Sequence, residues 1–209
     1  MHTEAPEYVA LQVGDAKLLV PVHSLMQTYL QQALDSTRPG APPSTAATSR
    51  PGPPRIGQTW PEEGGIYAGI MRGADGQPDY HLIVPADPQA SIEEIAWGGH
   101  GQETAGADSD ADGRANTQAL VQSDTAHPAA EWAAALRIDG HADFYLPSRR
   151  ELRLLWVNVP ELFEPAWYWS STQFPAYSAW FQDFVDGYQN YGHKGIEYRA
   201  RAVRRKVIE

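Results

Sequence analysis

A proline-rich stretch divides this chain. Residues 36–55, STRPGAPPSTAATSRPGPPR, hold six of the 17 prolines and contain no acidic and no large apolar residue. Such a composition cannot bury enough surface to offset the entropy lost on ordering, so a partly extended, semi-rigid linker is predicted. A proline-rich ligand for another module is the alternative. The chain is therefore predicted to consist of a small segment at 1–35, the linker at 36–55 and a larger domain at 56–209.

The segment before the linker carries signs of a hairpin and a helix. YVALQVGDAKLLVPV indicates two short strands around Gly14 and Asp15. Ser24 is expected to cap a helix that runs through about Leu34. Thirty-five residues are too few for an independent core. We therefore expect this segment to oligomerise or to dock onto a larger assembly.

From residue 56 onward the pattern predicts one α+β domain. GGIYAGIMRGADGQPDYHLIVP is typical of a hairpin, and residues 97–113 are expected to form a long loop. One helix is expected to be capped by Asn116, and a second to span 129–136 after Pro128. Ser148 followed by Glu151 is a capping box for a third. Short β-type runs then fill 168–203, which predicts a twisted antiparallel sheet with two or three helices.

Composition excludes several classes of protein. The chain has 209 residues, 16 basic and 26 acidic side chains and a net charge of −10, which argues against binding nucleic acid. The clustered Arg199, Arg201, Arg204, Arg205 and Lys206 are expected to pair with acidic surface groups. No apolar run is long enough to insert into a membrane, and the first residues do not form a secretory signal. Without cysteine, no thiolate metal site, disulfide or cysteine nucleophile can form.

One acidic loop resembles half of a metal site. Asp108, Asp110, Asp112 and Gly113 match the first half of an EF-hand calcium loop, but Ala119 stands where a bidentate Glu is required. A solvated acidic turn is the preferred interpretation, with structural calcium as the weaker alternative and no other cofactor expected. The histidines lack metal-ligand spacing, and no catalytic constellation is found, so the chain is not expected to be an enzyme.

Aromatic residues are concentrated near the C-terminus. Residues 167–198 contain 11 of the 22 aromatic side chains, interleaved with Asn, Ser, Gly, His and Asp. This mixture is typical of a paratope, where Tyr supplies contact area at low entropic cost and small polar residues adapt their hydrogen bonds. A core in which all these aromatics are buried is the alternative.

A series of short motifs carries a family resemblance. The series consists of Asp112–Thr117, Phe144–Ser148, Trp167–Gln173 and Arg199–Arg204, with Ala179, Trp180, Gly187 and Lys194 between the last two. Over residues 56–205 the chain resembles the domain at the C-terminus of the Lcl collagen-like adhesin. It resembles more closely the variable proteins of diversity-generating retroelements.

The resemblance implies a C-type-lectin-like fold, related in architecture to formylglycine-generating enzymes. It also implies that fixed residues, here called frame positions, alternate with diversified ones, here called display positions. The frame positions would be Trp167 to Gln173, Ala179, Trp180, Gln182, Phe184, Gly187, Gln189, Lys194 and Arg199 to Arg204. The display positions would be Phe174 to Ser178, Phe181, Asp183, Val185, Asp186, Tyr188, Asn190 to His193 and Gly195 to Tyr198.

The sequence thus favours a binding protein whose C-terminal surface recognises a protein or glycan on a cell surface, displayed on a phage tail or as an adhesin. A virion-associated or surface-displayed location is expected. Its predicted ligand-binding residues are Phe174, Tyr177, Ser178, Phe181, Asp183, Asp186, Tyr188, Asn190, Tyr191, His193 and Tyr198. The alternative is a structural or assembly protein with a buried aromatic core. A formylglycine-generating-like enzyme is less favoured, because that chemistry needs cysteine.

Overall fold

The computed structural model describes residues 8–13, 16–21 and 52–208. The chain separates into two compact units, Met1–Arg50 and Pro51–Glu209. In the first unit, β1 (Tyr8–Val13) pairs in antiparallel fashion with β2 (Ala16–Pro21), which confirms the two predicted strands. The helix predicted from Ser24, and the linker as far as residue 51, lie outside the described residues.

The second unit is α+β, as predicted. Its three helices are α2 (Gly113–Val121), α3 (Pro128–Ala135) and α4 (Arg149–Asn158). Its strands are β3 (Thr59–Trp60), β4 (Gly65–Met71), β5 (Tyr80–Val84), β6 (Ser91–Ala96), β7 (Trp167–Phe174), β8 (Ser178–Asp183), β9 (Gln189–His193), β10 (Glu197–Arg201) and β11 (Arg204–Val207). Three single-turn 3₁₀ helices lie at Pro61–Glu63, Pro88–Ala90 and Pro160–Leu162. No described helix is long and apolar enough to cross a membrane.

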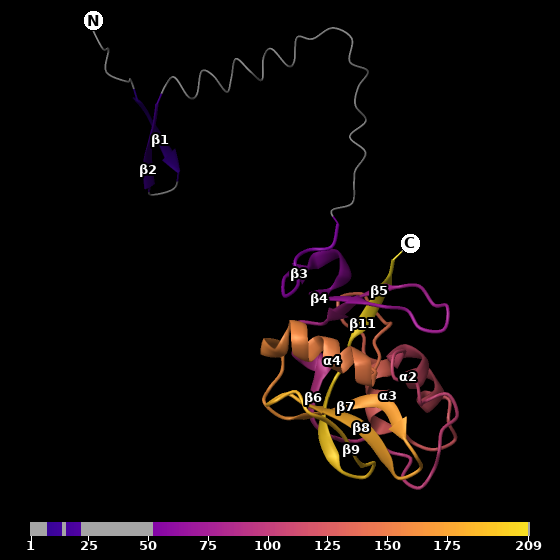
Figure 1. Cartoon of the computed structure of the whole chain (residues 1–209). Coiled ribbons are helices and arrows are strands. Elements are labelled where there is room, and N and C mark those ends of the chain that lie inside the picture. Colours follow the sequence, from indigo (N-terminus) through magenta and orange to yellow (C-terminus); the bar gives the residue numbers. More distant parts are fainter. Residues whose placement is uncertain (1–7, 14–15, 22–51, 209) are drawn as a thin grey trace, which may run out of the picture. The chain divides into compact units, whose positions relative to one another are not determined.

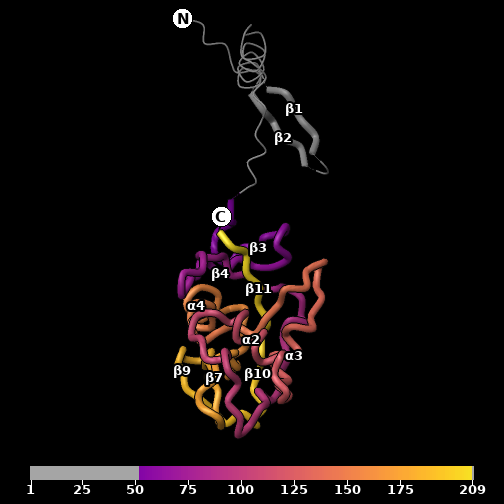
Figure 2. The backbone as a smooth tube through the Cα atoms, turned by 90° about the vertical axis from the view of Figure 1, so that its right-hand side faces the viewer, coloured from indigo at the N-terminus to yellow at the C-terminus, as the bar shows by residue number. Residues whose placement is uncertain are grey.

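The strands form two sheets with α4 between them. One sheet has the order β11-β5-β4-β3 and contains the predicted β4–β5 hairpin, while the other has the order β6-β10-β7-β8-β9. Figures 1 and 2 show α4 crossing the unit, with the first sheet on one side and β7, β8 and β9 on the other. The predicted antiparallel sheet is confirmed only in part, because in the second sheet β10 runs parallel to β7 through Arg199 and Tyr168. Alternation of side chains along a strand does not encode the direction of its neighbour.

The helix caps were only partly predicted. Proline opens α3, and the capping box of Ser148 and Glu151 opens α4, both as expected. The cap of α2 is Asp112, whose side chain accepts a hydrogen bond from the Ala115 amide, so the assignment of this cap to Asn116 is wrong. Asn116 is instead buried within α2, where its amide group donates to the Ser109 carbonyl at 2.7 Å. It therefore ties the predicted long loop to the helix.

A buried carboxylate joins four parts of the second unit. Glu151 is fully buried, and its Oε1 accepts hydrogen bonds from the hydroxyls of Tyr80 on β5, at 2.7 Å, and Tyr145, at 2.6 Å. Its Oε2 accepts from the backbone amides of Ser148, at 2.7 Å, and Gly113, at 3.2 Å. Burial raises the pKa of Glu151 above its usual value, opposed by these donors. Burial and the neighbouring carboxylate raise the pKa of both tyrosines, so the hydroxyls remain protonated donors.

The C-terminal cations bind acidic groups from distant segments, as the sequence suggested, except Arg201, which donates to the Pro85 carbonyl at 2.9 Å. The guanidinium of Arg204 contacts Glu63 and Asp143, each at 3.0 Å, and Lys206 contacts Glu63 as well. Arg205 pairs with Asp112 at 2.9 Å. These pairs fasten β11 both to the turn before β4 and to the N-terminus of α2. β3, near the start of the second unit, and β11, at its end, therefore belong to the same sheet.

Removal of the Glu151 carboxylate tests this junction. Glu151→Ala should lower the free energy of unfolding by about 3 kcal/mol or more, because each buried donor left without a partner costs about 1–3 kcal/mol. Glu161→Ala, which changes an exposed carboxylate, should stay within about 0.5 kcal/mol of wild type. Urea unfolding measures both variants. Equal midpoints for the two would contradict the role given to Glu151.

Candidate functional site

The predicted ligand-binding residues gather on one region of the five-stranded sheet. Phe174 ends β7, Tyr177 lies in the turn after it, and Ser178, Phe181 and Asp183 belong to β8. Asp186 and Tyr188 form part of the β8–β9 turn, Asn190, Tyr191 and His193 lie on β9, and Tyr198 lies on β10. β8 and β9 pair as an antiparallel hairpin. Successive side chains along each strand point to opposite faces, so these residues divide between the two faces of the hairpin.

One face carries an aromatic cluster that is open to solvent. The rings of Phe174 and Tyr191 stack at 4.1 Å, and Trp180 meets Tyr191 edge to face at 5.8 Å. The Arg149 guanidinium lies 3.6 Å from the centre of the Trp180 ring. Tyr191 keeps 48% of its surface exposed. This face therefore presents rings held in fixed positions beside a cation.

The end of the β8–β9 hairpin carries a second exposed group. Tyr177 is 62% exposed, and its ring lies 5.2 Å from that of His100. The His100 ring lies 4.0 Å from the ring of His193. His100 was not among the predicted ligand-binding residues, since its only sequence signal was the glycine-rich stretch around it. Tertiary contact between the 97–112 loop and the hairpin brings it to this group.

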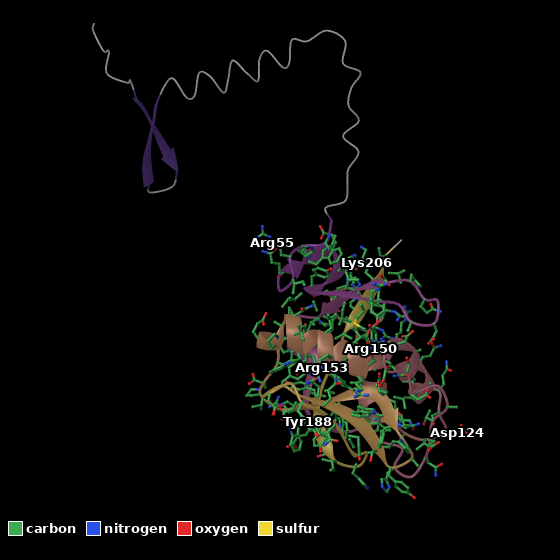
Figure 3. All side chains as sticks on the ribbon, in the orientation of Figure 1. Arg55, Asp124, Arg150, Arg153, Tyr188 and Lys206 are labelled. Atoms are coloured by element: carbon green, nitrogen blue, oxygen red, sulfur yellow. The ribbon has the colours of Figure 1, made fainter. Side chains whose placement is uncertain are left out.

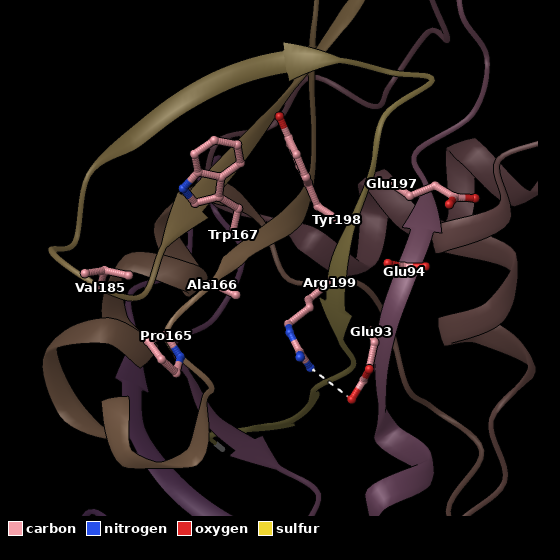
Figure 4. Close-up of a pocket in the computed structure, with 9 residues that line it drawn as sticks. All are labelled: Glu93, Glu94, Pro165, Ala166, Trp167, Val185, Glu197, Tyr198 and Arg199. Carbon is pink, nitrogen blue, oxygen red and sulfur yellow. Dashed lines mark ion pairs between the residues drawn. The ribbon is translucent and has the colours of Figure 1, made fainter.

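The opposite face contains a pocket of about 420 Å³. Figure 4 shows Trp167 and Tyr198 beside it, with the ion pair of Arg199 and Glu93 farther along its wall. Trp167 is 47% exposed and packs on Phe181 at 5.3 Å. Phe181 itself is buried, so it supports the pocket from below and does not offer a free ring to a ligand.

The predicted acidic and amide residues mainly shape the turns. Asp183 accepts a hydrogen bond from the Trp167 indole at 2.8 Å and another from the Val185 amide at 2.7 Å. Asp186 accepts from the amide of Tyr188, whose exposed ring is labelled in Figure 3. Asn190 accepts in the same way from the amide of the next residue, at 2.9 Å. Side-chain oxygens of Asp and Asn that accept hydrogen bonds from nearby backbone amides fix the conformation of the segments that carry the rings.

Gly187 sets the close approach of the β8–β9 turn to α4. Its φ is +81°, and a Cβ atom placed there would lie 2.3 Å from the Trp156 indole nitrogen. Its carbonyl accepts a hydrogen bond from Arg153 at 2.7 Å. Only glycine combines this backbone conformation with this contact. The turn that presents Tyr188 therefore rests on the helix beneath it.

Lys194 anchors the other end of the hairpin from inside the protein. This side chain is fully buried, and its ammonium donates to the Gln102 carbonyl at 2.7 Å and to the Gln173 side-chain oxygen at 2.9 Å. It also lies 4.7 Å from the centre of the Trp97 ring. Burial lowers the pKa of Lys194 to about 8. The ammonium thus holds the loop that carries His100 against the hairpin.

Burial separates the two classes of position in this region. The frame positions are mostly buried, among them Tyr168 to Thr172, Ala179, Gln182, Phe184, Gly187, Lys194 and Ala200. Trp167 alone among them is exposed. Among the display positions, Phe181 alone is buried, and all others are exposed or half-buried. The alternation of frame and display positions along the sequence therefore corresponds to an alternation of buried and exposed residues in the structure.

The acidic loop does not assemble a metal site among the described residues. Asp110 lies 3.6 Å from the Arg149 guanidinium, and Asp112 caps α2 and pairs with Arg205. No group of three or more potential metal ligands comes together in the described part of the chain. Two of the three carboxylates proposed for calcium thus have arginine partners.

No family model matches the chain, and no curated protein is significantly similar to it.

The buried ammonium predicts a pH-dependent contribution to stability. The pKa of Lys194 is about 8 when folded and 10.5 at its ordinary value, so between these pH values the unfolded chain binds more protons. The contribution of Lys194 to the free energy of unfolding should therefore rise as pH increases from 8 to 10. Urea unfolding of wild type and Lys194→Met at pH 7.5 and 9.5 measures this. The free energy of unfolding of wild type, compared with that of the variant, should be larger at pH 9.5 than at pH 7.5. A decrease in this difference would contradict the assignment.

Proposed function

We propose that residues 56–209 form a ligand-binding domain with a C-type-lectin-like fold, whose β7–β10 surface recognises a protein or glycan on a cell surface. The observation that carries this proposal is the separation by burial: display positions lie at the surface, and the frame beneath them is packed. Such a division lets surface residues change while the free energy of folding is conserved, because surface substitutions away from special features typically cost less than about 0.5 kcal/mol.

The chemistry of the exposed residues supports recognition of a partner. Tyr177, Tyr188 and Tyr191 are 62%, 59% and 48% exposed, so these three rings are not part of the buried core. Tyrosine is enriched at interfaces because its ring and hydroxyl provide apolar contact and hydrogen bonding together. The turns that carry these rings are fixed by Asp186, Gly187 and Lys194, so little ordering entropy would be lost on binding. The alternative, an assembly protein with its aromatics buried, is less favoured by these exposures.

In this proposal the chain is virion-associated or surface-displayed. Residues 1–35 attach the binding domain to a phage tail fibre or another display structure, and 36–55 act as a spacer. The composition of the linker and the division of the chain into two compact units support this proposal. The chain supplies binding rather than catalysis.

The triple variant Tyr177→Ala, Tyr188→Ala, Tyr191→Ala tests the binding surface. Binding of labelled protein to a panel of bacterial cells and glycans should fall at least 100-fold for a target that wild type recognises, since interface tyrosines often contribute about 1–2 kcal/mol each. The matched control is Ile56→Ala, Val121→Ala, Val207→Ala, which truncates comparably exposed apolar residues elsewhere. Unchanged binding by the tyrosine variant, with its unfolding midpoint preserved, would exclude this surface.

Diversification predicts a signature in DNA. The codons for residues 167–204 should have a near-duplicate that differs at adenines and lies beside a gene for reverse transcriptase. Sequencing the flanking DNA measures this directly. A locus with neither feature would remove diversification from the proposal and leave a binding surface of fixed sequence.

A further inference from the structure

A second groove lies on α4 and borders the aromatic cluster at Arg149, whose guanidinium stacks on Trp180. It has a volume of about 570 Å³ and is bounded by one side of α4 and by β4 with the connection that follows it. Its walls are cationic and apolar. The residues that define it, here called the α4 groove, are Arg72, Arg150, Arg153, Leu154, Val157 and Ile70.

The groove is positive in a protein that is acidic overall. Four guanidinium groups and one carboxylate, that of Asp110, line it, whereas the whole chain carries a net charge of −10. Arg149 and Arg153 stand four residues apart on α4, a spacing at which like charges destabilise a helix by about 0.2–0.5 kcal/mol. The groove therefore concentrates cations in a chain whose net charge is negative.

Internal contacts account for only part of this charge. Arg149 contacts Asp110 and Gln189, and Arg153 donates to the Gly187 carbonyl. The Arg150 side chain makes no hydrogen bond or ion pair with any described residue. Arg72 lies 3.7 Å from Asp79, but its side chain is 92% exposed. At least two guanidinium groups are therefore available to an anion.

Apolar side chains continue the same stripe. Arg150, Arg153, Leu154 and Val157 follow the i, i+3, i+4, i+7 spacing of one helix face, over about 10 Å. Val157 is 66% exposed and Ile70, across the groove, is 49% exposed. Figure 3 labels Arg150 and Arg153 on this helix. The stripe is cationic toward the start of α4 and apolar toward its end.

We propose that the α4 groove docks an acidic peptide segment of a partner protein, with carboxylate side chains on Arg72, Arg150 and Arg153 and apolar side chains against Ile70, Leu154 and Val157. The guanidinium groups of Arg150 and Arg153 lie on α4, and that of Arg72 lies on the connection after β4. Cations at several separate positions are suited to a peptide that carries several carboxylates along its chain. A single-headed lipid or fatty acid offers one anionic group to these positions. A nucleic acid would meet the acidic remainder of the protein and an aliphatic wall that does not stack with bases.

Nuclear magnetic resonance of the ¹⁵N-labelled full chain tests the proposal with a defined probe. The probe is acetyl-Glu-Glu-Gly-Leu-Val-amide, which places two carboxylates before two apolar side chains. Its addition should shift the amide signals of Arg150, Arg153, Val157 and Ile70, with a dissociation constant on the order of a millimolar for so short a ligand. The peptides with Gln-Gln in place of Glu-Glu, or Ser-Thr in place of Leu-Val, should bind at least fivefold more weakly.

Charge variants separate a specific groove from general attraction. Arg150→Glu should weaken binding of the probe about tenfold, and Arg150→Gln about threefold, since exposed ion pairs contribute about 0.2–1 kcal/mol each. Neither change removes an internal contact, so the unfolding midpoint should stay near that of wild type. The control Arg55→Gln, Arg114→Gln removes two exposed cations outside the groove and should leave binding unchanged.

Three results would overturn the proposal. The first is an absence of shifts at the groove, and the second is equal binding of the Gln-Gln and Glu-Glu peptides. The third is tighter binding of octanoate or of a short oligothymidylate than of the probe, which would assign the groove to a lipid or to a nucleic acid. Tyr177, Tyr188 and Tyr191 do not line the groove, so the triple tyrosine variant should bind the probe as wild type does.

Discussion

The buried carboxylate of Glu151 is the interaction on which the rest of the second unit depends. It is reached by two tyrosine hydroxyls and two backbone amides, which come from β5, from the segment before α4, from the start of α4 and from the start of α2. A buried carboxylate is stable only when donors replace the water it has lost. The requirement for these four donors therefore fixes how one sheet, two helices and a connecting segment meet.

A second set of buried polar groups fixes the loops around the β8–β9 hairpin. Lys194 holds the loop that carries His100, while Gly187 allows the opposite turn to rest on Trp156. Neither residue is at the surface, and both determine where surface rings stand. The proposed ligand-binding surface thus owes its rigidity to contacts beneath it, and its chemistry to side chains that the core does not constrain.

Helix α4 connects the two proposed interaction surfaces. Arg149 at its start stacks on Trp180 under the aromatic cluster, and Arg153 binds the carbonyl of Gly187 in the β8–β9 turn. The exposed side of the same helix carries Arg150 and Val157 toward the α4 groove. A helix packed between two sheets has one free side, and here that side is both cationic and apolar. The proposed docking groove and the proposed ligand-binding surface therefore share one helix, and Arg149 contacts both.

The sequence by itself determined the local elements. The capping box at Ser148, the proline that opens α3 and the apolar runs on either side of the β4–β5 turn each specify a structure through neighbouring residues, and each is observed. Of the display positions that the resemblance implied, only Phe181 is buried. Tertiary structure alone decided that β10 runs parallel to β7 and that His100 reaches the hairpin. These features depend on residues that are far apart in the chain, and local spacing carries no information about which distant groups will meet in the core.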